Sequence, residues 1–485
     1  MGMKRLVCLA LIVILCAAPV TVFAAGRVPY RNFNYGFWGD FVPSPAAYVP
    51  VMSIGGPSLN PPVEPFRNPE HMFVADNGDI YVADTGNDRL VVFDRDLNLV
   101  KIIDSFIRDG HEDGFNRPHG VFVTHDFYIY IADTENHRVV VLNKYGEYVM
   151  TFDEPEHETL EDQFIFAPLR VCVDRAGQVY VIVRNVFEGI MNFNPDGTFV
   201  GYFGTVAVRH TIFDRIWRWL STEAQRARQQ LFIPVEFASM DIDEYGFIFT
   251  TNIAPGTQEA RVKRLNTGGQ NVLRNFTDHP IVGDLTFFPF GRLGGPAVFV
   301  DIVARGNGMY SVLDSTRGRL FTYDSEGNLL YVIGGTGNVM GMGHFPVAVE
   351  VLDDSILILD RQRGEIVYFR PTEYGRLINE AIALRYSGDE ARAVEVWRQV
   401  LTLNENFTLA YAGIGKALLA AGENEQALYY LRKGMALDYY GIAFHRLRNT
   451  ILQENLSMIL TILMTGVVVI VGLRSYKKFR KQVAV

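Results

Sequence analysis

One segment of this chain occurs twice with little change. It reads YVADTGNDRLVVFDRDLNL from Tyr81 to Leu99 and YIADTENHRVVVLNKYGEY from Tyr130 to Tyr148. Each copy lies in a longer unit that opens on a proline and continues as four apolar runs separated by turns. Four short strands repeated at roughly 40 to 50 residues are typical of propeller blades. A single blade cannot bury both of its faces, so the repeat predicts several blades stacked around one axis.

Six such units can be traced along the chain. They open near Pro69, Pro118, Pro168, Pro234, Pro296 and Pro346. The sixth unit stops after three apolar runs, so the fourth strand of that blade must come from elsewhere. The segment AAYVPVMSIGG, residues 46–56, resembles NLLYVIGG, residues 328–335, which ends the fifth unit. We therefore expect the N-terminal segment to complete the sixth blade and close the ring.

This pattern resembles the NHL-repeat family of β-propellers, most specifically in the first, second and fifth units. The resemblance implies a mainly β fold, with a six-bladed propeller over residues 27–371. The third and fourth units keep the rhythm of strands but lose the Asp and Arg of the repeated motif. Their loops are therefore expected to depart from the family.

The motif itself is Asp-x-x-x-x-Arg. It occurs as Asp84 with Arg89, Asp133 with Arg138, and Asp314 with Arg319. A carboxylate at the end of one strand and a guanidinium on the next can bridge a tight turn. Residues repeated around a ring are expected to stabilise the blades rather than to catalyse a reaction. In the sixth unit Glu365 takes the place of the Arg, so no bridge is expected there.

Helical periodicity replaces the strand pattern after Pro371. Two segments within residues 374–440 align at a shift of about 34 residues, with Ala393 matching Ala427 and Trp397 matching Leu431. This resembles a pair of tetratricopeptide repeats, which implies a small helical module that binds peptides or partner proteins. A packing spacer is the alternative. Residues 441–455 are expected to form a capping helix.

Both ends of the chain carry apolar segments. Residues 1–25 have a basic start and an apolar run, which predicts a signal peptide, with an uncleaved anchor as the alternative. Residues 456–473 contain no charge and predict one transmembrane helix, with a buried core helix as the alternative. The basic tail, 474–485, is expected in the cytosol. The protein would then be a single-pass cell-membrane protein with most of its chain extracytoplasmic.

A basic, amphipathic segment, residues 205–231, interrupts the propeller. Ile212, Ile216 and Leu220 recur at helical spacing among several arginines. Two interpretations remain open, a helix that binds a membrane surface or a partner, and a helical cover over the propeller.

Polar residues where the first strand of each blade begins form the candidate ligand site at the channel mouth. They are Glu70, His71, His119, Arg170 and Glu236. Blades five and six offer only apolar residues there, so the site would be lopsided and suited to a polar, partly anionic ligand. Solvated channel residues without a ligand are the alternative. Some relatives of NHL propellers are lyases or lactonases with an axial metal, but nothing in this spacing demands a metal, a cofactor or a catalytic residue.

Composition limits the classes of partner and of covalent cross-link that the chain can have. A net charge of −9 argues against nucleic acid. Without residues 1–25, Cys172 is the only cysteine, which excludes an intrachain disulfide. The layout resembles exported proteins of Gram-positive bacteria, some encoded beside solute transporters. It predicts a membrane-anchored extracytoplasmic binding or scaffold protein with a protein partner, as an accessory of a transport complex in one reading. A propeller enzyme of the lyase or lactonase type is the alternative.

Overall fold

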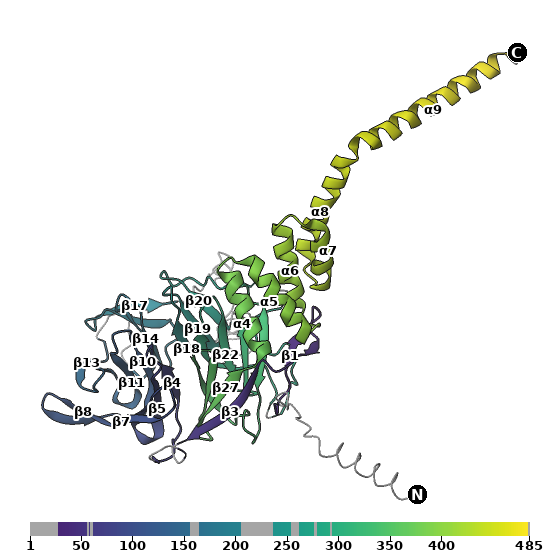
Figure 1. The fold of residues 1–485 in the computed structure, drawn as a ribbon. Helices are drawn as coiled ribbons and strands as arrows, with labels where there is room; N and C mark the ends of the chain where they lie inside the picture. The colour runs from purple at the N-terminus through teal and green to yellow at the C-terminus, as the bar shows by residue number, and fades with distance from the viewer. Residues whose placement is uncertain are drawn as a thin grey trace, which may run out of the picture.

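Strands make up the first part of the protein and helices the last part (Figure 1). The computed structural model describes residues 28–55, 58, 62–155, 164–204, 236–253, 261–275, 279–291 and 293–483. The predicted signal peptide, 1–25, and the basic insert, 205–231, lie outside the described residues. The mainly β fold with a helical C-terminal region is confirmed.

Blades one to three are four-stranded antiparallel sheets. Blade one contains β4 (His71–Val74), β5 (Ile80–Asp84), β6 (Arg89–Phe93) and β7 (Leu99–Ile103). Blade two contains β10 (Pro118–Val123), β11 (Ile129–Asp133), β12 (Arg138–Leu142) and β13 (Tyr148–Phe152). Blade three contains β14 (Pro168–Val173), β15 (Val179–Val183), β16 (Ile190–Phe193) and β17 (Phe199–Phe203).

Blades four to six complete the ring. Blade four contains, in its described part, β18 (Glu236–Ile242), β19 (Ile248–Ile253) and β20 (Val262–Leu265). Blade five contains β21 (Phe299–Ala304), β22 (Tyr310–Asp314), β23 (Arg319–Tyr323) and β24 (Leu329–Gly334). Blade six contains β25 (Pro346–Leu352), β26 (Ser355–Asp360), β27 (Glu365–Pro371) and the N-terminal β3 (Tyr48–Gly55).

The first strands of the six blades surround the axis. Each contacts the next in the order β4, β10, β14, β18, β21, β25, and β25 contacts β4 again. Every residue of β5, β6 and β12 is buried. A blade within a ring is covered by a neighbour on each face, so its middle strands are continuously apolar rather than alternating.

The N-terminal strand closes the ring. β3 runs antiparallel to β27, with Tyr48 opposite Pro371 and Gly55 opposite Glu365. The predicted closure by residues 46–56 is therefore confirmed. This pairing joins the two ends of the propeller sequence and covers an edge of β27 that would otherwise be open.

Two hairpins lie outside the blades. β1 (Phe33–Tyr35) and β2 (Phe41–Pro43) form one, and β1 contacts the outer strand β24 of blade five. β8 (Ser105–Arg108) and β9 (His111–Gly114) form the other, between blades one and two. In Figure 1 the β8 hairpin projects on the side of the propeller away from the helices.

Two helical hairpins and a longer helix follow the propeller. They are α4 (Glu373–Tyr386), α5 (Glu390–Leu403), α6 (Thr408–Ala420), α7 (Asn424–Lys433) and α8 (Leu437–Glu454). Small residues lie where helices cross, since a Cβ on Gly415 would come within 2.6 Å of Leu431 Cγ. Ala393, Ala427, Trp397 and Leu431, the residues aligned from the sequence, are all fully buried. Their equivalent burial agrees with the internal repeat, while membership of the tetratricopeptide class stays a prediction.

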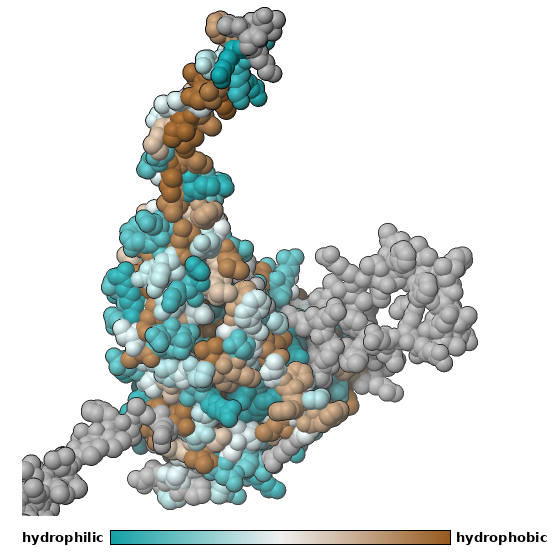
Figure 2. Space-filling view, turned by 90° about the vertical axis from the view of Figure 1, so that its right-hand side faces the viewer, coloured by the Kyte–Doolittle hydropathy of each residue, from teal (hydrophilic) through white to brown (hydrophobic). Residues whose placement is uncertain are grey.

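The last helix, α9 (Leu456–Val483), follows α8 and contacts it. Within it, residues 456–480 are long and apolar enough to cross a membrane, and none of the apolar window is buried. α8 and α9 lead away from the propeller, and an apolar stretch runs along this stalk (Figures 1 and 2).

Partly buried polar contacts join the helices to the propeller. The Thr372 side chain caps α4 and donates to the carbonyl of Ala46 at 2.6 Å. Arg305 donates to the hydroxyls of Tyr331 and Tyr48 at 2.5 and 2.6 Å. Asn379 of α4 donates to Tyr48 at 3.0 Å. The closing strand, blade five and α4 therefore share one hydrogen-bond network.

Candidate functional site

Two of the predicted Asp–Arg bridges form, at equivalent strand ends of blades one and two. Arg89 Nε donates to Asp84 Oδ2 at 2.8 Å, and Arg138 Nε donates to Asp133 Oδ2 at 2.9 Å. Both carboxylates are fully buried. In each case the Asp and the Arg face each other across the turn between the second and third strands.

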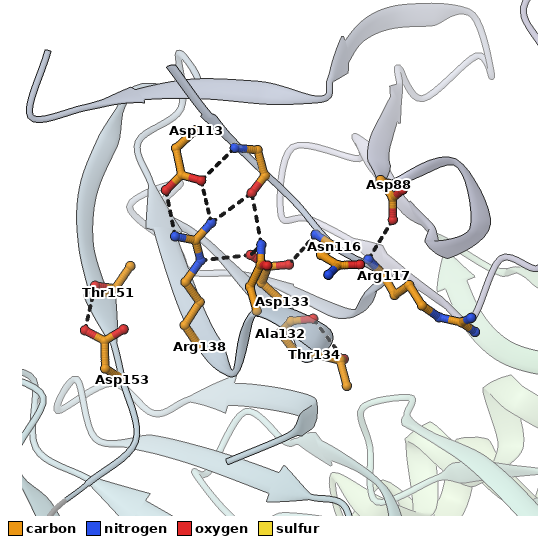
Figure 3. A network of polar contacts seen from close by, with 12 residues as sticks. Asp88, Asp113, Asn116, Arg117, Ala132, Asp133, Thr134, Arg138, Thr151 and Asp153 are labelled. Atoms are coloured by element: carbon orange, nitrogen blue, oxygen red, sulfur yellow. Dashed lines mark hydrogen bonds and ion pairs between the residues drawn. The ribbon is translucent and has the colours of Figure 1, made fainter. Parts of the chain in front are cut away.

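Each bridge also holds the loop that enters its blade. In blade two, Asp133 Oδ1 accepts the backbone N–H of Asn116 at 2.7 Å. The same guanidinium of Arg138 pairs with Asp113 of β9 at 2.6 Å (Figure 3). Asp84 accepts the backbone N–H of Arg67 in the same way, at 2.7 Å. These contacts favour the structural interpretation of the motif.

The prediction of a third bridge, between Asp314 and Arg319, is wrong. The two residues face each other across β22 and β23. Arg319 Nη1 instead pairs with Asp284 Oδ1 at 2.6 Å, while the nearest cation to Asp314 is Arg317 at 3.9 Å. Asp284 lies in the loop before blade five, and its buried carboxylate reaches this strand end. It therefore binds the Arg319 guanidinium in place of Asp314. In blade six, Glu365 pairs with Arg363 at 2.6 Å. Glu365 lies opposite Asp360, where the Arg of the motif would stand, so these two positions form no Asp–Arg bridge.

Four of the five predicted channel residues lie together. Arg170 donates from Nη2 to the carbonyl of Glu70 at 3.2 Å and from Nη1 to the carbonyl of His119 at 3.4 Å. His71 lies close enough to Arg170 and His119 for both neighbours to lower its pKa. Glu70, His71 and Arg170 are buried, and His119 is half-buried. Blades one, two and three therefore contribute to one polar cluster.

Glu236 has a different environment. Its Oε1 accepts the backbone N–H of Asn185, from the blade-three loop, at 3.0 Å. The residue that pairs with Glu70 is Arg361 of blade six, which was not among the residues predicted from the sequence. The site therefore includes an arginine from the far end of the propeller sequence.

Burial sets the charge state of the cluster. Burial and the neighbouring charge of Arg170 lower the pKa of His71 well below 6.5 and that of His119 to about 3. Burial raises the pKa of Glu70, although Arg361 and Arg170 oppose the shift. Both imidazoles are therefore neutral at physiological pH, and the positive charge of the cluster lies on arginines.

The expectation that blade five offers only apolar residues where its first strand begins is wrong. Asp301 of β21 occupies the register position that Arg170 occupies in β14, each just after a register shift in its strand. Glu350 of β25 and Asp241 of β18 lie one inward-facing position further along. A charged residue inside an otherwise apolar run is the signal that would have revealed Asp301, in VFVDIV, and Glu350, in VAVEVL, whereas Asp241 lies in the more polar SMDID.

These axial acids bond to the next blade. Asp241 Oδ2 accepts the backbone N–H of Ala304 in blade five at 2.7 Å. Asp301 Oδ2 accepts that of Val349 in blade six at 2.7 Å.

Blade one continues the series. His71 Nδ1 accepts the N–H of Val121 in blade two at 3.3 Å. At these three junctions, a side-chain acceptor on one first strand binds a backbone donor on the next. These contacts are called the inter-blade bonds below.

The inter-blade bonds already use some of the hydrogen-bond acceptors of the axial side chains. Asp301 Oδ1 also accepts from the Ser239 hydroxyl at 2.5 Å, so both of its oxygens are used. Burial raises the pKa of Asp241 to about 7 and also raises the pKa of Asp301 and Glu350. Among the described residues, no group of three or more His, Cys, Asp or Glu side chains is arranged to hold a metal.

A second candidate site lies where the helices meet the propeller. A pocket of about 350 Å³ opens there, between the β1–β2 hairpin, blade five and the helices α6 and α8. Its lining includes Phe37, Leu285 and Leu329 on the propeller side and Leu409, Lys416 and Tyr439 on the helical side. No single repeat pattern predicts this pocket, since its two walls come from different modules.

Comparisons with known proteins identify one repeat of the propeller. An NHL repeat model matches residues 66–93. No curated protein matches the chain. Among solved structures, the chain is similar to virginiamycin B lyase from Staphylococcus aureus, with 8% identity, coverage of 66% of this chain and 99% of that one, and a TM-score of 0.41.

Two further structures give the same level of similarity. A putative gluconolactonase shows 9% identity, coverage of 71% of this chain and 98% of that one, and a TM-score of 0.40. The extracellular domain of a putative hybrid two component system from B. thetaiotaomicron shows 12% identity, coverage of 62% and 33%, and a TM-score of 0.35. At these scores the similarities carry no argument about activity. The chain is a six-bladed β-propeller that contains an NHL repeat and continues into a helical region with one apolar C-terminal helix.

Proposed function

We propose that this chain is a membrane-anchored binding or scaffold protein whose propeller and helical module face the extracytoplasmic side. The apolar, unburied segment 456–480 supports the anchor. Arg474, Lys477 and Lys478 lie in its last turns, and the positive-inside rule favours a cytosolic position for them. The stalk formed by α8 and α9 would hold the globular part outside the membrane.

The observation that carries the binding role is the pocket between the two modules. Ligand sites occur preferentially at such junctions, because two rigid units can shape one cavity without either losing its own core. The shared network of Arg305, Tyr48 and Asn379 holds these walls together. At the axis, by contrast, Asp241, Asp301 and His71 are engaged in inter-blade bonds, which favours binding at the junction over catalysis at the axis.

A surface cross-linking experiment on intact cells tests both halves of this proposal. A membrane-impermeant amine-reactive cross-linker is added, and the full chain is then purified by a tag on its C-terminus. We expect a cross-linked adduct with the wild type, because the lysines of the propeller and helices face outward. Leu437→Arg should remove the adduct, since Leu437 lines the pocket and is 54% exposed.

Tyr145→Arg is the matched control, because Tyr145 is an exposed turn residue of blade two, 72% exposed. It should form the wild-type adduct. A chain that the impermeant reagent does not modify would contradict the outward topology. An adduct of equal yield from Leu437→Arg would contradict binding at the junction.

A further inference from the structure

Blade five covers part of the inner surface of the helical hairpins. Glu326, in the turn between β23 and β24, pairs with Arg385 of α4 at 3.3 Å and with Lys416 of α6 at 3.1 Å. A Cβ on Gly308, in the neighbouring turn, would come within 2.7 Å of the Tyr386 ring. The propeller therefore occupies the first part of this surface, and what remains open beyond it is the pocket.

The size of the pocket limits the ligand. At about 350 Å³ the pocket lies at the small end of the range of ligand pockets in proteins, which is roughly 300–1,000 Å³. A folded domain or a long peptide does not enter this space as a whole, although one side chain of a partner docked at its rim can. A small molecule, or a group of that size, does.

The walls favour an aromatic or otherwise flat apolar group. Phe37, Leu285 and Leu329 line one side, and Leu409 and Tyr439 line the other. Tyr439 is 40% exposed, so its ring is accessible. Aromatic rings add a geometric preference to the burial of apolar area.

Lys416 gives the pocket one positive charge that its neighbours do not fully neutralise. Its ammonium group has three donors, of which one reaches Glu326. Glu326 also faces Arg385, so a single carboxylate serves two cations. The Lys416 side chain is only 22% exposed, whereas Asp438, an acid that also lines the pocket, is exposed, so water and salt screen its charge more strongly.

We propose that this junction pocket binds a small aromatic carboxylate, with the ring between the two walls and the carboxylate at Lys416. The inference rests on the binding role proposed above and names the chemistry of the ligand. Lys416 would donate its remaining hydrogen bonds to the carboxylate oxygens. The ring would pack beside Tyr439, whose own ring lies 4.6 Å from Lys416 Nζ.

The test uses phenylacetate as the probe and the full chain in lipid nanodiscs. Binding is measured by calorimetry, with 2-phenylethanol and acetate as probes that lack the carboxylate or the ring. We expect phenylacetate to bind more tightly than either. Lys416→Met keeps the apolar stem and removes the charge, so it should weaken phenylacetate about tenfold and leave 2-phenylethanol unchanged. Lys433→Met, the same change on the exposed side of α7, should behave as the wild type.

A second variant predicts the opposite sign. Glu326→Gln removes the carboxylate that competes for Lys416, so phenylacetate should bind several-fold more tightly, even if Lys416→Met proves unstable. Equal binding of phenylacetate to wild type, Lys416→Met and Glu326→Gln would overturn the inference, as would undetectable binding to the wild type. An adduct lost in Leu437→Arg together with no phenylacetate binding would leave the anchored binding protein intact and exclude only this ligand class.

Discussion

At the scale of single residues, Arg138 shows how the repeated motif works. One guanidinium binds Asp133 on the neighbouring strand and Asp113 on the β8–β9 hairpin. It also lies 5.6 Å from the centre of the Phe106 ring. Because Asp133 is fully buried, its charge depends on this partner and on the backbone N–H of Asn116. The motif is therefore a local device for holding a turn, an entry loop and a hairpin.

Arg138→Ala should destabilise the propeller without abolishing ligand binding. A buried carboxylate that loses its charged partner costs on the order of 1–3 kcal/mol. The free energy of unfolding, measured in denaturant on the full chain, should fall by that amount. Arg175→Ala, an exposed change in blade three, should stay within about 0.5 kcal/mol of the wild type. Unchanged stability with lost binding would assign Arg138 to a ligand site instead.

At the scale of elements, β3 does the work of a fourth strand in the last blade. Its backbone pairs with β27 along seven positions, from Tyr48 to Gly55. It also meets the helical module, since the Tyr48 hydroxyl accepts from Asn379 of α4 at 3.0 Å and the carbonyl of Ala47, just before β3, accepts the backbone N–H of Thr372 at 2.9 Å. Ring closure and the start of the helical module therefore depend on the same strand.

Deletion of residues 27–56 should unfold or oligomerise the protein. It removes β3 and exposes the edge of β27, which can then pair with another chain. Size-exclusion chromatography and thermal melting provide the measurement. Deletion of residues 27–45 alone, which spares β3, should have the smaller effect. A stable monomer with an unchanged melting temperature after the longer deletion would contradict the role of β3.

At the scale of the whole molecule, the inter-blade bonds join first strands around the axis. They use Asp241, Asp301 and His71, which belong to three different blades. Asp241 and Glu350 are only partly exposed, and burial is the main cause that raises the pKa of each. The negative charge of Asp301 raises the pKa of Asp241 further, and the charges of Asp241 and Asp301 raise that of Glu350. The stability of the ring is thereby coupled to the protonation of its axis.

Stability should fall as the pH rises from about 4 to about 7. Burial raises the pKa of Asp241 to about 7 in the folded protein, against about 3.9 for an unfolded Asp. Between these values the folded protein holds a proton that the unfolded chain has released, so its contribution is complete below pH 4 and lost as the pH passes 7. Asp241→Asn should flatten this decline in melting temperature.

The two proteins are compared by how steeply the melting temperature changes with pH, not by the melting temperature itself. The reason is that Asn has one acceptor oxygen fewer than Asp. Asp96→Asn, an exposed change in blade one, should keep the wild-type slope. The same slope in Asp241→Asn would show that other acids at the axis, Asp301 and Glu350, account for the pH dependence.

The sequence by itself determined the blades, their number and their closure. Strand periodicity, turn residues and the similarity of residues 46–56 to residues 328–335 are local properties that a reader can align. The apolar segment 456–473 could also be recognised from the sequence, because its length and lack of charge alone predict a helix that can cross a membrane. The Asp84 and Asp133 bridges followed for the same reason, since each joins adjacent strands.

Only the tertiary structure decided what meets across blades and between modules. Asp284, from a loop before blade five, forms an ion pair with Arg319 in place of Asp314. Asp301 and Glu350 reach the axis because a register shift in each first strand changes which side chains point inward. The junction pocket forms from walls far apart in the chain. Such contacts depend on how blades pack and where helices dock, and neither periodicity nor local propensity records those distances.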